Sequence, residues 1–132
     1  MTVESPYSDL VLRYFDDPPC AGSLDAAQSD VFTGSAGTRE AGLQVRFEAK
    51  IREGTIDAMA FQAYACPHII AACSLIAERL GGQGVNELDR LDVGALMTEL
   101  AIPVEKTGRL LIVQDALHDC LRAWDNRRLA GN

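Results

Sequence analysis

The 132-residue chain has no excess of positive charge, because 12 Lys and Arg residues stand against 19 Asp and Glu, for a formal net charge of −7. Proteins bind nucleic acids through surfaces rich in Lys and Arg, so this balance argues against a nucleic-acid partner. No apolar run approaches the roughly 20 residues that a membrane-spanning helix needs. Residues 1–4 also lack the basic and then apolar pattern of a signal peptide. We therefore expect a cytoplasmic protein with no membrane partner.

Closely spaced cysteines are missing as well. The chain has four cysteines and no CxxC pair: Cys20, Cys66, Cys73 and Cys120. Thiols stay reduced in the cytosol, so we do not expect a disulfide framework. Zinc sites usually pair their cysteines at short spacing, which makes these four a weak zinc signal. The chain also lacks a phosphate-binding loop and an HExxH pattern, and we do not expect an enzyme.

The residues that are present predict one globular domain over residues 1–132, with 48% apolar and 23% charged residues. Apolar and polar side chains alternate over residues 43–51, as in a strand with one buried face. A turn at Glu53-Gly54 separates this strand from a second one at residues 56–64, which predicts an antiparallel hairpin.

Segments with helical periodicity lie before and after the predicted hairpin in the sequence. A helix is expected after Ser5, its N-cap, with Pro6 at its first position, and residues 17–38 are expected to form a loop. Three more helices are expected: one from Pro67 to the glycines after Leu80, a short one capped by Asp92, and a last one with its apolar face at Leu110, Val113, Leu117, Leu121 and Trp124. The pattern predicts an α+β fold, in which a small antiparallel sheet packs against helices.

Several segments, taken in order, resemble the IscU/NifU scaffold family of iron–sulfur cluster assembly. Residues 22–25 (GSLD) are similar to the end of the family loop "NPRNVGSLD", and residues 61–66 (FQAYAC) to its strand end "FKTFGC". Residues 102–106 stand where the family has "LPPVK", and residues 114–117 match "EDAL". The resemblance runs from about residue 7 to residue 124. It implies the family fold and a role in cluster assembly, with iron or an iron–sulfur cluster as cargo and a cysteine desulfurase or other cluster-assembly proteins as partners.

The chain departs from the family at the cluster ligands. Family members carry three cysteines, and of these only the middle one is kept, as Cys66. The loop before the hairpin, residues 34–42, contains neither Cys nor Asp. Gly108 and Arg109 stand where the family has a His and its third Cys, so the resemblance places the Arg109 guanidinium beside Cys66. The segment that the family offers to its Hsp70 chaperone is altered at Val104 and Glu105.

Cys66 precedes Pro67 at the expected start of a helix, where unpaired N–H groups and the helix dipole favour an anion such as a thiolate. His68 is a candidate second ligand or proton carrier, although a histidine in a first helical turn is more often solvated or hydrogen-bonded. Cys73 and Cys120 fall on apolar helix faces and are expected in the core. Cys20 lies in a Pro-rich loop and is a weak ligand candidate.

Two hypotheses remain open from the sequence. The first is a divergent scaffold that binds iron, a cluster or transferred sulfur at Cys66, with further ligands from Cys20, His68, a second subunit or a partner. The alternative is a pseudo-scaffold, a binding or regulatory module that keeps the fold and holds no metal. Because a cluster or zinc ion wants four ligands, we expect the isolated protein to bind neither tightly.

Overall fold

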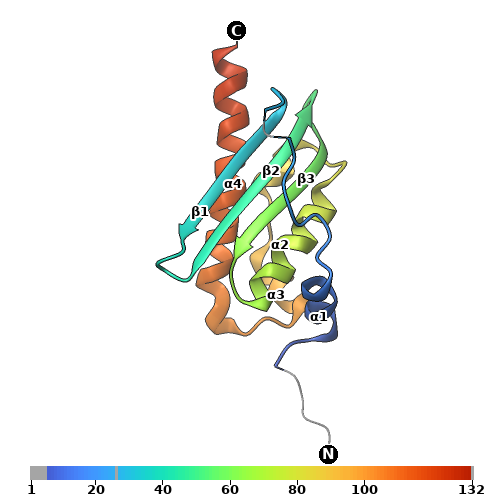
Figure 1. Ribbon diagram of the computed structural model, residues 1–132, viewed down its shortest axis with the longest axis vertical. Helices are drawn as coiled ribbons and strands as arrows, with labels where there is room; N and C mark the ends of the chain where they lie inside the picture. Colours follow the sequence, from blue (N-terminus) through green and yellow to red (C-terminus); the bar gives the residue numbers. More distant parts are fainter. Residues whose placement is uncertain (1–5, 26, 132) are drawn as a thin grey trace, which may run out of the picture.

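The computed structural model describes residues 6–25 and 27–131. Its elements follow one another along the chain as α1 (Asp9–Asp16), β1 (Val31–Thr38), β2 (Leu43–Arg52), β3 (Thr55–Tyr64), α2 (Pro67–Leu80), the 3₁₀ helix η1 (Val85–Asp89), α3 (Val93–Leu100), the 3₁₀ helix η2 (Val104–Lys106) and α4 (Thr107–Ala130) (Figure 1).

The three strands form an antiparallel meander in the order β1-β2-β3. In β2 the side chains of Leu43, Val45 and Phe47 are buried and alternate with exposed polar ones, as the sequence pattern predicts. Both residues of the β2–β3 turn, Glu53 and Gly54, have positive φ, as a tight hairpin turn requires. The predicted hairpin is therefore confirmed.

Strand β1 corrects the expectation of a loop through residue 38. Its central residues, Thr33 to Gly37, are small or polar and show no apolar alternation, so the sequence gives no strand signal there. The strand forms because all eight of its residues pair with β2, from Val31 opposite Lys50 to Thr38 opposite Leu43. Tertiary pairing thus overrides weak local preference.

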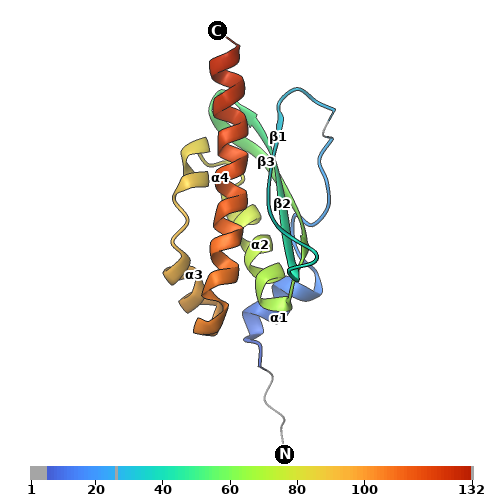
Figure 2. The same cartoon turned by 90° about the vertical axis from the view of Figure 1, so that its left-hand side faces the viewer.

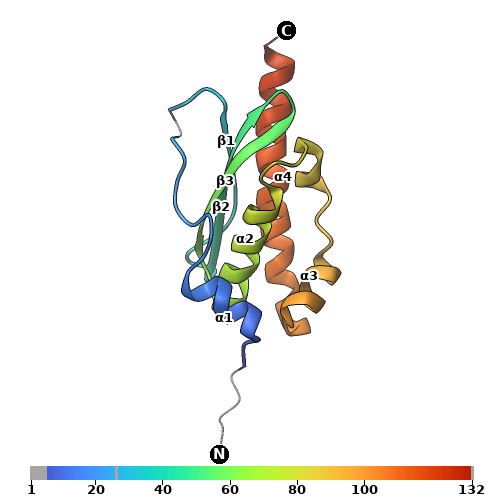
Figure 3. The same ribbon diagram turned by 90° about the vertical axis from the view of Figure 1, so that its right-hand side faces the viewer.

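Helices α2 and α4 cover one face of the sheet, and residues 17–25 and 27–30 lie on the other side of it (Figures 2 and 3). α4 packs mainly on β1, and α2 packs on β3 and α1. The apolar faces of these elements form one continuous core, which confirms the α+β class. In the part of the chain that the structure describes, no helix is both long and apolar enough to cross a membrane.

Helix α1 begins later than expected. Its N-cap is Ser8, whose Oγ accepts a hydrogen bond from Val11 N at 3.2 Å and donates one to the Leu100 carbonyl at 2.8 Å. The expected cap, Ser5, lies outside the described residues. The expected cap of α3 is confirmed, because the Asp92 carboxylate accepts from Ala95 N at 3.0 Å.

The segment after α1 is fastened to the sheet by polar contacts. Leu24 N donates to the buried Glu48 carboxylate at 3.2 Å, and Gln62 Nε2 donates to Ser23 Oγ at 2.7 Å. Backbone bonds join Phe61 N to the Cys20 carbonyl and Gly22 N to the Phe61 carbonyl, both at 2.9 Å. These bonds cover the free edge of β3 at its middle.

Gly34 in β1 lets α4 approach the sheet backbone to backbone. A Cβ at this position would overlap the Ala116 carbonyl and Cys120 N and lie 2.7 Å from the Cys120 Cα. These are main-chain atoms of a packed helix, so no side chain can rotate away to make room.

We therefore predict that Gly34→Ala lowers the free energy of unfolding by about 3 kcal/mol, because α4 must move off the sheet. Urea denaturation followed by circular dichroism measures the change. Gly108→Ala is the matched control, since it also adds one methyl group but meets open space in the first turn of α4. It should be neutral or stabilising by up to about 1 kcal/mol. Equal stability of the two variants would contradict the close approach.

Candidate functional site

Cys66 lies at the junction between β3 and α2, as the sequence predicts. It is the N-cap of α2, with φ −74° and ψ 165°, and Pro67 occupies the first helical position. Its carbonyl accepts hydrogen bonds from Ile69 N and Ile70 N, both at 3.0 Å. The Cys66 side chain makes no capping bond and is half-buried. The thiol therefore lies at a helix N-terminus, with its backbone fixed and its sulfur within reach of solvent.

The cation that contacts this thiol is Lys106. Its Nζ lies 3.6 Å from Cys66 Sγ. Lys106 ends η2, a turn in which Lys106 N donates to the Pro103 carbonyl at 2.9 Å. The sequence reasoning expected Arg109 in this place. Arg109 lies in the first turn of α4, three residues after Lys106, and its proximity to Cys66 stays a prediction.

His68 is buried, so of the two arrangements expected for a first-turn histidine, solvated or hydrogen-bonded, the solvated one is wrong. Only 4% of it is exposed, and its ring lies 4.6 Å from the Tyr7 ring, tilted by 59°. Neither ring nitrogen makes a hydrogen bond of normal geometry with the described residues, although the backbone of Pro6 approaches the ring. Burial and then the charge of Lys106 lower the His68 pKa, which favours the neutral ring. A ligand role for His68 remains a prediction.

Cys20 occupies a different place on the sheet. It pairs with Phe61 in the middle of β3, whereas Cys66 follows the end of that strand. Burial, together with the Glu78 carboxylate, raises the pKa of the Cys20 thiol. In the described part of the chain, no group of three or more His, Cys, Asp or Glu side chains is arranged to hold a metal ion.

Cys73 and Cys120 are core residues, which confirms the expectation from their helical periodicity. Both are fully buried. Cys120 Sγ donates a weak hydrogen bond to the Phe32 carbonyl at 3.5 Å. Burial raises the pKa of both thiols, that of Cys120 to about 12, where the neighbouring Asp119 adds to the effect.

The site also has residues that the sequence reasoning missed. It did not assign Lys106 or Tyr7 to the site. Lys106 could have been found, because it is the last residue of the segment that resembles "LPPVK". Tyr7 gave no such signal, since its contact with His68 joins residues 61 positions apart in the chain. The resulting arrangement is one accessible thiol beside one ammonium group, which suits a sulfur nucleophile better than a multidentate metal site.

We predict that iodoacetamide modifies Cys66 in the native protein and leaves Cys73 and Cys120 unmodified. Thiolates are the reacting species, and raised pKa values keep the two core thiols protonated at pH 8. Peptide mass spectrometry after a short exposure identifies the modified residues. In about 6 M guanidinium chloride, which unfolds most domains, all four cysteines should react. Rapid native modification of Cys73 or Cys120 would show that we have misassigned the buried helix faces.

Comparison with known proteins places this site in context. The family model described as NifU-like N terminal domain matches residues 6–130. The iron–sulfur cluster assembly scaffold protein IscU of Azotobacter vinelandii is 31% identical over 123 residues, which cover 92% of this chain and 96% of that protein. IscU of Escherichia coli K12 is 26% identical over 125 residues, covering 94% and 98%.

Solved structures show the same fold. The N-terminal NifU-like protein of Brucella abortus superposes with a TM-score of 0.70 at 20% identity, covering 91% of this chain and 94% of that one. A putative SUF-system assembly scaffold from Fervidobacterium islandicum AW-1 gives a TM-score of 0.66 at 14% identity, covering 87% and 96%. Scaffolds of this kind are not enzymes, in line with the sequence expectation. By its family match and its curated relatives, the chain belongs to the NifU/IscU family of iron–sulfur cluster assembly scaffolds.

Proposed function

We propose that this protein handles sulfur for cluster assembly through a single thiol, Cys66, and does not hold a complete cluster by itself. The observation that carries the proposal is the 3.6 Å contact between Lys106 Nζ and Cys66 Sγ at the N-terminus of α2. A positive charge and a helix N-terminus both favour an anionic sulfur, whether thiolate or persulfide. The same ammonium group opposes a metal cation at this position.

The chemical step is a sulfur transfer between thiols. The Cys66 thiolate attacks the outer sulfur of a donor persulfide, such as that of a cysteine desulfurase. A new S–S bond forms between Cys66 Sγ and the outer sulfur, and the S–S bond of the donor breaks. The inner cysteine sulfur of the donor leaves as a thiolate. The outer sulfur keeps its proton or loses it to water. No external oxidant or reductant is needed, because one persulfide and one thiol are exchanged for another such pair.

The donor set around Cys66 does not fit a whole cluster. A [2Fe–2S] cluster needs four ligands, chiefly thiolates and imidazoles. His68 could supply an imidazole only after leaving its buried contact with Tyr7. A cluster bridged by Cys66 and His68 of two chains would therefore require this end of the protein to open. If this protein carries iron or a cluster as cargo, a partner protein must therefore supply the remaining ligands.

Exposed apolar side chains near the thiol support docking of a sulfur donor. Tyr64, two residues before Cys66, is 53% exposed, and Val104, in the turn that carries Lys106, is 78% exposed. Isolated exposed apolar residues are common, but these two come from the elements that hold the site. A cysteine desulfurase in a reducing compartment such as the cytoplasm is the partner that this chemistry suits.

We predict that a persulfide-loaded cysteine desulfurase adds one sulfur atom to Cys66, detected by intact-protein and peptide mass spectrometry. Cys66→Ser should abolish the addition. Lys106→Met keeps much of the side-chain length and removes the charge, so it should slow transfer by about tenfold, the factor that about 1.4 kcal/mol represents. Cys20→Ser is the matched control and should transfer at the wild-type rate. Sulfur on Cys20, or full activity of Cys66→Ser, would refute the assignment.

Anaerobic reconstitution with iron and sulfide tests the remaining alternatives. We expect the isolated protein to stay colourless and to retain little iron, because the site offers one thiolate and a cluster needs four ligands. Visible absorption and iron content are compared between wild type and Cys66→Ser. Stoichiometric iron that disappears in the variant would restore a full scaffold role. If neither protein binds iron and neither accepts sulfur, the chain is a docking module that keeps the family fold.

A further inference from the structure

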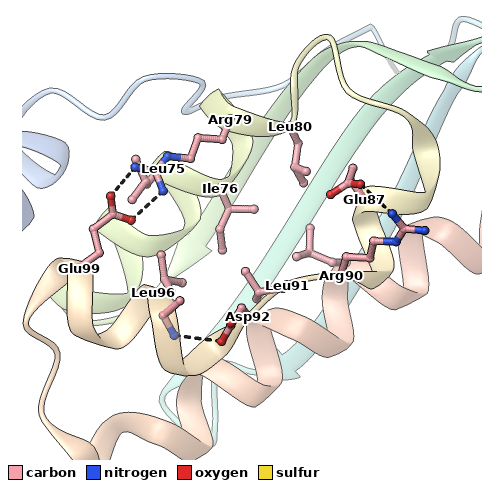
Figure 4. A pocket seen from close by; sticks show the side chains of 12 residues that line it. Leu75, Ile76, Arg79, Leu80, Glu87, Arg90, Leu91, Asp92, Leu96 and Glu99 are labelled. Atoms are coloured by element: carbon pink, nitrogen blue, oxygen red, sulfur yellow. Dashed lines mark hydrogen bonds and ion pairs between the residues drawn. The ribbon is translucent and has the colours of Figure 1, made fainter.

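A second site lies at the C-terminal half of α2, the end of that helix opposite Cys66. An open cavity of about 220 Å³ separates this half of α2 from the η1–α3 segment (Figure 4). Its floor is apolar and consists of Leu75, Ile76, Leu80, Leu91, Leu96 and Leu117. Water molecules in this cavity gain few hydrogen bonds from such walls. A large apolar side chain would displace them favourably.

The rim of the cavity is charged and on balance acidic. Arg79 is held by Glu99, with Nη1 2.7 Å from Oε1, and Arg90 contacts Glu87 at 3.3 Å (Figure 4). Asp92 also lines the cavity, so three carboxylates stand against two guanidinium groups. Each guanidinium group is paired with one of the two glutamates. Asp92, whose carboxylate also caps α3, leaves the rim with a net charge of −1, which favours an occupant carrying positive charge.

The end of α4 offers this chemistry. The last turns of α4 extend beyond the sheet and the other helices (Figures 1 and 2). Leu129 there is 64% exposed, and the two residues before it, Arg127 and Arg128, are exposed arginines. Arg127 lies over the Phe32 ring at 5.2 Å, and Arg128 contacts Asp125 at 3.4 Å, so a partner would add to or replace these contacts. A large apolar side chain next to two cations thus stands on a projecting helix, accessible to another molecule.

We propose that this cavity binds the α4 end of a second copy of the chain, with Leu129 on the apolar floor and Arg127 and Arg128 against the acidic rim. The contact cannot form within one chain, because Leu117 lines the cavity and Leu129 follows twelve residues later on the same straight helix, about 18 Å away. Two chains with antiparallel α4 helices could exchange their ends reciprocally. This arrangement makes a closed two-fold dimer rather than a filament.

Sedimentation equilibrium over loading concentrations from about 10 μM to 1 mM tests the proposal, since a contact with one apolar anchor per side corresponds to a weak dissociation constant. A reducing agent excludes disulfide-linked species. We expect a monomer–dimer equilibrium for the wild type. Leu129→Asp and Ala95→Trp should each weaken it at least tenfold, the first by removing the anchor and the second by filling the cavity from an exposed lining position.

Leu111→Asp is the matched control, because Leu111 is also an exposed leucine of α4 but lies near the opposite end of the helix. It should dimerise like the wild type, and thermal unfolding confirms that each variant is folded. A wild-type monomer at every concentration would overturn the proposal. So would association that the two site variants leave unchanged, association that Leu111→Asp weakens equally, or oligomers that grow beyond the dimer.

Discussion

The approach of α4 to Gly34 is the constraint on which the candidate site depends. Since main-chain atoms of the helix lie against main-chain atoms of β1, the depth of α4 on the sheet is fixed by backbone rather than by adaptable side chains. α4 begins at Thr107, directly after Lys106, so the position of this helix also sets where the ammonium group arrives. The packing of α4 against Gly34 in β1 therefore helps to set the position of the Lys106 ammonium group beside Cys66, which follows β3.

The charge beside the Cys66 thiol is opposite in sign to the net charge of the whole protein. The chain carries a net charge of −7, yet the charged group in contact with Cys66 is a cation. The core of the fold is mostly aliphatic and aromatic, drawn from the sheet and the helices, and Cys66 only packs against it. Fold and site chemistry can thus diverge separately, and membership of a scaffold family does not by itself define the cargo.

Much of the fold could be predicted from local patterns, and the failures have physical causes. Alternation identified β2, the turn at Glu53-Gly54 identified β3, and the Asp92 cap identified the start of α3, because these signals lie within a few residues. β1 was missed because Thr33 to Gly37 acquire their strand conformation from pairing with β2 and packing under α4. His68 was predicted from its position in a helix, whereas the structure buries it and places its ring against that of Tyr7, a residue distant in the chain. At the site, the family resemblance indicated Arg109, which stays a prediction, and it did not lead us to expect Lys106, which the turn at η2 brings to the sulfur.

The long separation between Cys66 and Lys106 has a consequence for newly made protein. The sheet is a meander of neighbouring strands, so its pairing can form as soon as β3 is synthesised. Lys106 follows Cys66 by 40 residues, and at about 5–20 residues per second the ribosome needs roughly 2–8 s to reach it. During that interval the nascent chain carries a thiol without its cation and without the helix that seats the cation. The contact between the thiol and its cation is therefore complete only after α4 has docked on the sheet, so the last helix to be synthesised is also the one that completes this site.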